Sequence, residues 1–193
     1  MENRETFKEL FNAWVKRPGA AELLAWLEST DFFEAPASTK YHGAYPGGLL
    51  EHSLNVCREL MASDINRSAS TESMVICSLL HDVCKANYYA EIGMDGDGKT
   101  LYQVIDQFPF GHGEKSVFLI SQFMRMTDEE ALAIRWHMGP YDEAAGSYAY
   151  KDARRYAKFR WPMVIALHDA DMTATQKGQR EEKGGGAGNE KDA

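Results

Sequence analysis

Apolar residues recur every three or four positions along much of the chain, which is the spacing of an amphipathic helix. Near the start, this pattern runs from Phe7 to Val15, stops at Pro18-Gly19, and begins again over Ala20–Glu28. Both segments are predicted to be helices that bury one face against the rest of the protein.

The same spacing predicts five further helices later in the chain. Thr127 and Glu130 have the spacing of a capping box, which marks a helix start, and Pro162 suits the first turn of another helix. The predicted helices cover Leu49–Met61, Thr71–Lys85, Gly113–Met124, Thr127–His137 and Trp161–Thr175.

One segment departs from the helical pattern. Residues Tyr88–Ile92 and Thr100–Ile105 are strand-like and flank the turn sequence Asp95-Gly96-Asp97-Gly98. A calcium loop is a poor alternative, because its twelfth position would be Asp106 rather than a bidentate glutamate. The sequence therefore predicts an all-α protein with a small β-hairpin insertion.

The chain has 193 residues, 44% of them hydrophobic. A chain of this length can bury a core without a structural metal or a disulfide framework, so a bound metal would serve chemistry. We expect packing helices over residues 1–40, a main domain over 41–176, and a disordered polar tail over 177–193 that includes Gly184-Gly185-Gly186.

Charge and cysteine content narrow the possible partners and location. With 21 Lys and Arg against 29 Asp and Glu, the net charge is −8, which disfavours long nucleic acid as a partner. Three cysteines, an odd number, fit reduced thiols. Because the sequence also shows no signal peptide and no long apolar run, we expect a cytoplasmic protein that does not enter a membrane.

The histidines carry the main functional signal, because they lie beside acids, glycines or predicted helix ends. A buried histidine can simply be a hydrogen-bonded core residue. The pair His81-Asp82, however, ends an apolar helix and is costly to bury unless a cation compensates it. The other candidates, each weak alone, are His52, His112, His137 and Asp171.

Taken in order, these residues resemble the ligand pattern of the HD superfamily of metal-dependent phosphohydrolases, over roughly Tyr41 to Thr175. The segments Tyr45–Ser53 and Leu79–Lys85 are similar to the HD portion of bacterial 3′–5′ exoribonucleases. Gly111–Ser116 and Ala133–Gly139 resemble the two extra histidine motifs of the binuclear branch.

The resemblance implies an HD-domain helical bundle with two divalent transition-metal ions. One ion would be held by His52, His81, Asp82 and Asp171, and Asp82 would bridge to a second ion held by His112 and His137. Imidazole and carboxylate together suit Mn, Fe, Co, Ni or Zn, and a donor set without thiolate is not a closed structural zinc site.

Some assignments stay open at this stage. Asp169 is an alternative to Asp171 as the closing carboxylate, although the family pattern favours Asp171. Cys84 stands where family members often have glycine, and Cys77, four residues before His81, is a possible thiolate donor or a buried thiol.

Three basic residues follow or precede the candidate ligands closely enough to hold substrate phosphates. Lys85 and Lys115 each lie about one helical turn after a candidate ligand, and Arg135 precedes His137 by two residues. The alternative is that all three form ordinary salt bridges on helix surfaces.

The expected function is hydrolysis of a phosphate ester or anhydride in a small nucleotide-type substrate, by metal-activated hydroxide, with Asp82, Lys85, Lys115 and Arg135 in catalytic roles. Two alternatives remain: an HD-type diiron oxygenase, and a nucleotide-binding regulatory module without catalysis.

Overall fold

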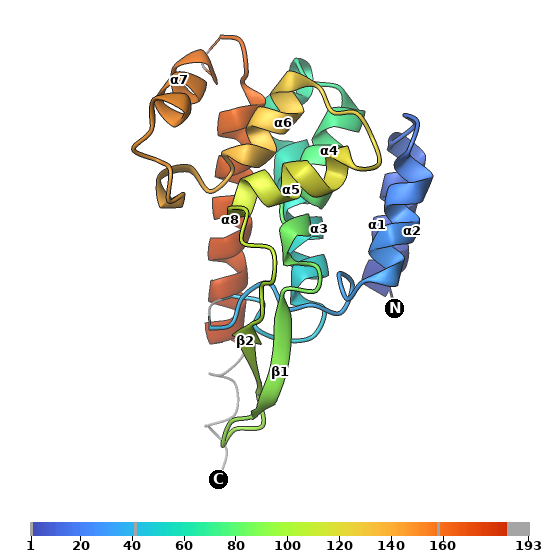
Figure 1. Ribbon diagram of the computed structural model, residues 1–193, viewed down its shortest axis with the longest axis vertical. Helices are drawn as coiled ribbons and strands as arrows, with labels where there is room; N and C mark the ends of the chain where they lie inside the picture. Colours follow the sequence, from blue (N-terminus) through green and yellow to red (C-terminus); the bar gives the residue numbers. More distant parts are fainter. Residues whose placement is uncertain (1, 41, 158, 185–193) are drawn as a thin grey trace.

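The computed structural model describes residues 2–40, 42–157 and 159–184, and over these residues the protein is mostly helical (Figure 1). The predicted all-α architecture with one small hairpin is confirmed. The helices are α1 (Glu2–Trp14), α2 (Ala20–Ser29), α3 (Gly48–Ala62), α4 (Thr71–Leu80), α5 (His112–Ser121), α6 (Asp128–Arg135), α7 (Tyr148–Ala157) and α8 (Met163–Gly184). The strands are β1 (Tyr89–Met94) and β2 (Thr100–Val104), and short 3₁₀ helices cover Asp64–Arg67, Val83–Lys85 and Gly139–Tyr141.

The long helix α8 forms one side of the molecule and packs along α3 and α6 (Figure 1). Helix α4 lies against α3 and α6, and α1 covers α3 and α4 from the opposite side. The apolar faces of these helices meet in one core whose largest fully buried side chains include Phe7, Leu27, Leu49, Ile76 and Ile120.

The hairpin extends from one end of the helical body (Figure 1). Its antiparallel register pairs Tyr89 with Val104, and a bulge lies between Glu91 and Gly93. The Asp95 carboxylate accepts the backbone N–H groups of Asp97 and Lys99, as expected for a plain turn.

Two helices end before the residues that the sequence pattern indicated. Helix α4 stops at Leu80 rather than Lys85, and the N–H groups of Lys85 and Ala86 donate to carbonyls three residues back. Helix α6 stops at Arg135, two residues before His137. Both His81 and Asp82, which follow the end of α4, are buried.

Helix α7 was not predicted. It buries only Tyr150, Ala153 and Ala157, and two of these three are alanines. These three residues recur at helical spacing, so the periodic pattern is present, but charged residues make the segment polar on average and its apolar face is small.

The last helix is longer than predicted, since α8 continues to Gly184 instead of ending near Thr175. Residues 177–184 of the expected disordered tail are therefore helical, and residues 185–193 lie outside the described part. The extension contains good helix formers, and Lys177 forms an ion pair of 2.6 Å with Glu59 on α3.

Among the described residues, none of the helices combines the length and the hydrophobicity that crossing a bilayer requires.

Candidate metal centre

Five helices bring the candidate ligands to one place inside the bundle. His52 lies on α3, His112 begins α5, and Asp171 lies on α8, whereas His81-Asp82 and His137 follow the ends of α4 and α6. All except His112 are buried, and the rings of His81 and His137 have no exposed surface. Helix ends and helix faces from distant parts of the sequence thus converge on a single site.

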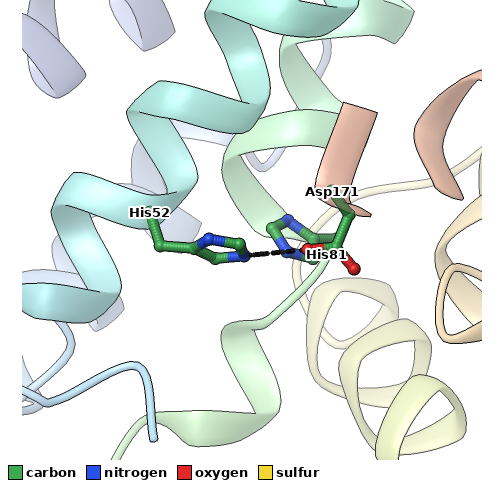
Figure 2. A group of neighbouring side chains, drawn as sticks. All are labelled: His52, His81 and Asp171. Carbon is green, nitrogen blue, oxygen red and sulfur yellow. Dashed lines mark hydrogen bonds and ion pairs between the residues drawn. The ribbon is translucent and has the colours of Figure 1, made fainter. Parts of the chain in front are cut away.

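The first group of donors joins α3, α4 and α8. His52 Nε2 lies 3.1 Å from Asp171 Oδ1 and 3.2 Å from His81 Nε2 (Figure 2). Each residue in this group offers one atom to the same small volume, so the three could hold a metal ion.

Asp82 lies between two sets of histidines. Its Oδ2 atom is 3.5 Å from His81 Nε2 and 3.9 Å from His52 Nε2. Its Oδ1 atom is 2.7 Å from His112 Nε2 and 3.4 Å from His137 Nε2. The two carboxylate oxygens are therefore nearest to different pairs of histidines, and His81, Asp82 and His137 also form one donor group.

Backbone hydrogen bonds fix the orientation of two rings. His81 Nδ1 lies 2.8 Å from the Ser78 carbonyl oxygen, and His137 Nδ1 lies 2.7 Å from the Ile134 carbonyl oxygen. Because a carbonyl only accepts, each Nδ1 carries a hydrogen and donates. A neutral ring then presents the lone pair of Nε2 to the site, as metal-ligating histidines do.

Burial lowers the pKa of His81 to about 4, more than the nearby carboxylate charges raise it, so this ring is neutral near pH 7. Its Nε2 lone pair then faces a carboxylate oxygen of Asp82, an electrostatically unfavourable contact. His137 Nε2 is buried and makes no hydrogen bond within the described residues. His81 Nε2 also lies within hydrogen-bond distance of His52 Nε2, so His137 Nε2 is the nitrogen that a cation placed among these atoms would satisfy.

Three of the donor separations match what an ion needs, whereas His112 Nε2 lies closer to Asp82 Oδ1, at 2.7 Å. Metal–ligand bonds of about 2.0–2.2 Å separate neighbouring nitrogen and oxygen ligands by about 3.0–3.5 Å. The contacts that join His52 to Asp171, His81 to Asp82 and His137 to Asp82 measure 3.1, 3.5 and 3.4 Å. The residues present fit divalent ions, and the chemistry of the donors leaves the metal open among those that imidazole and carboxylate accept.

Both acidic groups are ionised in spite of their burial. Burial raises the pKa of Asp82, but the charge of Lys85 and the charge and hydrogen bond of His112 outweigh it and hold that pKa well below its usual range. For Asp171, His52 likewise outweighs burial and lowers the pKa. The centre therefore concentrates negative charge.

Part of that charge is balanced by neighbouring protons. Burial disfavours protonated His112, yet Cys84 and Asp82 raise its pKa to about 10. The charge of Asp82 also raises the pKa of Lys85 against the effect of burial. Protons and a metal ion are alternative ways of neutralising the same group of atoms.

Each of the three predicted phosphate-binding side chains has a carboxylate partner. Lys85 Nζ lies 2.6 Å from Asp82 Oδ2, and Lys115 Nζ lies 2.6 Å from Asp106 Oδ1. Arg135 pairs with Glu114 and, at 2.7 Å, with Asp142, while its guanidinium lies over the Trp136 ring. Only Lys85 contacts a candidate ligand directly.

A cavity of about 480 Å³ opens beside His112. Lys115 and Arg135 line it, together with Cys84 and the aromatic rings of Tyr88 and Tyr141. Its acidic lining residues are Asp106, Glu114, Asp142 and Glu143.

The structure distinguishes between the alternative metal ligands that the sequence left open. Asp171 lies in the donor cluster, whereas Asp169 is exposed. Cys77 is fully buried and belongs to none of the donor groups found among the described residues. His168, one turn before Asp171, bonds the His137 carbonyl oxygen at 2.6 Å and so supports the turn that carries His137.

Cys84 is the residue that sequence reasoning missed. Its sulfur lies 3.4 Å from His112 Nδ1 and 3.8 Å from His112 Nε2, in a donor group with Asp82. The available signal was the unusual cysteine at a position where the HD pattern often has glycine. In an α-helix continued to Lys85, Cys84 would point about 200° away from Asp82, so the predicted helix gave no indication that the two residues lie in one donor group.

No protein-family model, curated protein or solved structure matches this chain.

Proposed function

We propose that this protein is a metal-dependent phosphohydrolase of the HD type that acts on a phosphate ester or anhydride of a small nucleotide-type substrate. The observation that carries the proposal is the position of Asp82, whose two oxygens lie nearest to two different pairs of histidines. One bridging carboxylate between two ligand groups is the arrangement that a binuclear centre needs. The free state of the three cysteines agrees with a cytoplasmic location.

When bound, two divalent ions supply Lewis-acid charge and water activated for attack at neutral pH. His81 and His137 keep their Nε2 lone pairs directed inward through their Nδ1 hydrogen bonds. Lys85 holds Asp82 through a charge-assisted hydrogen bond and restricts the rotation of its carboxylate.

The adjacent cavity favours a small substrate. Its volume is within the range of small-molecule sites, and Tyr88 and Tyr141 offer aromatic faces to a base. Lys115 and Arg135 are the cations that would turn from their carboxylate partners to a substrate phosphate. Four carboxylates line the same cavity, so a polyanion would depend on the added charge of the ions.

The test is elemental analysis of the purified protein, followed by phosphate release from nucleoside mono-, di- and triphosphates, cyclic nucleotides and dinucleotides. Mn²⁺, Co²⁺ or Ni²⁺ is added, and Asp82→Asn serves as the matched variant. We expect close to two ions per chain and turnover of one nucleotide class, both lost in Asp82→Asn while the helical circular dichroism remains.

Other results would overturn the proposal in distinct ways. Two irons, oxygen consumption and no phosphate release would assign the centre to a diiron oxygenase. Nucleotide binding that stabilises the protein without any product, even with added metal, would assign it to a regulatory module.

A further inference from the structure

We propose that Cys84 is a ligand of the second ion, so that this half of the centre combines sulfur, nitrogen and oxygen donors. The inference rests on the proposed binuclear centre. It adds a protein donor beside Asp82 Oδ1, His112 and His137, and it implies that the two ions differ in their metal preference.

The position of the sulfur fits coordination. A metal–sulfur bond of about 2.3 Å and a metal–nitrogen bond of about 2.0–2.1 Å place the two ligand atoms about 3.6 Å apart at a tetrahedral angle. Cys84 Sγ lies 3.8 Å from His112 Nε2, the ring nitrogen that also contacts Asp82 Oδ1. Cys84, His112 and Asp82 each offer a donor atom within 4.8 Å of the others.

The backbone holds Cys84 in this place. The N–H group of Cys84 donates to Ser116 Oγ at 3.2 Å, and Ser116 is fully buried. Ser116 lies one turn after His112 on α5, so the same helix carries the histidine and anchors the cysteine. The side chain of Cys84 is buried at the edge of the cavity beside His112.

His137 gives independent support for an ion beside Asp82 Oδ1. Its ring is fully buried, and its Nε2 atom has no hydrogen-bond partner among the described residues. That atom lies 3.4 Å from Asp82 Oδ1, the oxygen that also contacts His112. A shared S–H···N bond between Cys84 and His112 would leave this nitrogen unsatisfied, whereas an ion bound at Asp82 Oδ1 would satisfy it.

The chemical consequence is an asymmetric centre. His52, His81 and Asp171 supply only nitrogen and oxygen, whereas a thiolate in the second group selects softer ions such as Zn²⁺, Co²⁺ or Fe²⁺ over Mn²⁺. As the sulfur binds, the thiol proton passes to solvent, and the thiolate removes one positive charge from the side of the centre next to the cavity.

The experiment is a Co²⁺ titration of the full chain, followed by visible and near-ultraviolet absorption. Cobalt d–d bands report binding by any donor, and a thiolate-to-cobalt charge-transfer band reports sulfur. The wild type and a Cys57→Ser/Cys77→Ser double variant, in which Cys84 is the sole cysteine, are compared with Cys84→Ser.

We expect the charge-transfer band in the first two proteins and its loss in Cys84→Ser, with d–d bands from the other ion retained. Zn²⁺ affinity of the second equivalent should fall by about tenfold or more in Cys84→Ser. Circular dichroism checks its fold, and the double variant keeps the test valid if Cys84→Ser does not fold.

Cobalt binding without a charge-transfer band in the wild type would overturn the role of Cys84 and leave the metal centre standing. A band that persists in folded Cys84→Ser, or disappears in the double variant, would also overturn it. Absence of any cobalt binding would overturn the metal centre itself and the inference with it.

Discussion

At the scale of single residues, α8 presents two aspartates two positions apart, and only one can face the bundle interior. Asp171 contacts His52, whereas Asp169 is exposed on the other side of the helix. In a helix, residues two apart point about 200° away from each other, so a common role for both is excluded.

Asp171→Asn should therefore lower metal affinity about 100-fold or more, because it removes a charged ligand, while Asp169→Asn should bind like the wild type. Elemental analysis after dialysis against a defined free-metal concentration measures the difference. The opposite ranking would mean that the ligand on α8 is misassigned.

The clustered histidines and aspartates could be predicted from sequence as candidate ligands because each lies in a short segment with a recognisable neighbourhood, such as His81-Asp82 after an apolar helix. The partners of Lys115 and Arg135 could not. Asp106 and Asp142 approach them through tertiary folding, and no local spacing encodes that approach. The contact of Cys84 with His112 could not be predicted either, because the direction of the Cys84 side chain depends on where α4 ends.

At the scale of elements, the start of α5 passes very close to the end of α6. A β-carbon added to Gly113 would collide with the backbone carbonyl of Arg135. The absence of a side chain at Gly113 thus lets His112 approach His137, and their ring centroids lie 5.1 Å apart.

Gly113→Ala should force the two helices apart, which costs about 2 kcal/mol of unfolding free energy and weakens binding of the second ion. Gly146→Ala is the matched control, because no atom lies within 4 Å of its added β-carbon. Urea denaturation and cobalt titration measure the two effects. If the two variants had the same unfolding free energy and the same cobalt affinity, α5 would be able to move without loss of stability or metal binding.

Two helical segments were not predicted from the sequence: α7 and the part of α8 that follows Thr175. Five central helices have clear apolar stripes, and their existence was predicted. Helix α7 has a periodic but small apolar face in a polar segment, and the α8 extension has a polar sequence that is supported by tertiary contacts such as Lys177 with Glu59.

At the scale of the whole molecule, Arg17 ties the N-terminal helices to the body. This residue lies between α1 and α2, and its guanidinium bonds Glu130 Oε1 and Oε2 at 3.0 and 2.8 Å. Burial raises the pKa of Glu130, but the bonds from Arg17 and from the Thr127 N–H outweigh it and lower the pKa. The pair therefore stabilises the fold only while Glu130 is ionised.

Because the folded pKa of Glu130 is lowered, its contribution is complete above the unfolded value of about 4.3 and is lost as pH falls through the folded value. Glu130→Gln should be less stable than the wild type by about 2 kcal/mol at pH 7, and the difference should shrink below about pH 4. Denaturant melts across this range test it, with exposed Glu22→Gln as the control. A difference that does not change with pH would contradict the ionic role.

Metal binding should also stabilise the whole fold, since the candidate ligands come from five helices. A saturating ion at 100 times its dissociation constant adds about 2.7 kcal/mol to the unfolding free energy if only the folded state binds it. Thermal melts with Mn²⁺, Co²⁺ or Zn²⁺, and again after chelation, measure this gain. If the melting temperature with the ion bound equalled that after chelation, the prediction that the ion binds only the folded state would be contradicted.

The two Nδ1 hydrogen bonds have a consequence for how the chain can vary in length. His81 and His137 each bond a carbonyl three residues earlier, so the direction of each ring depends on the phase of its own helix. One residue inserted between Ser78 and Asp82 would rotate the ligand pair by about 100°, whereas one inserted at the tip of the hairpin would leave every donor in place. Natural variants that retain the centre should therefore differ in length at the hairpin and keep the Ser78-to-Asp82 and Ile134-to-His137 intervals constant.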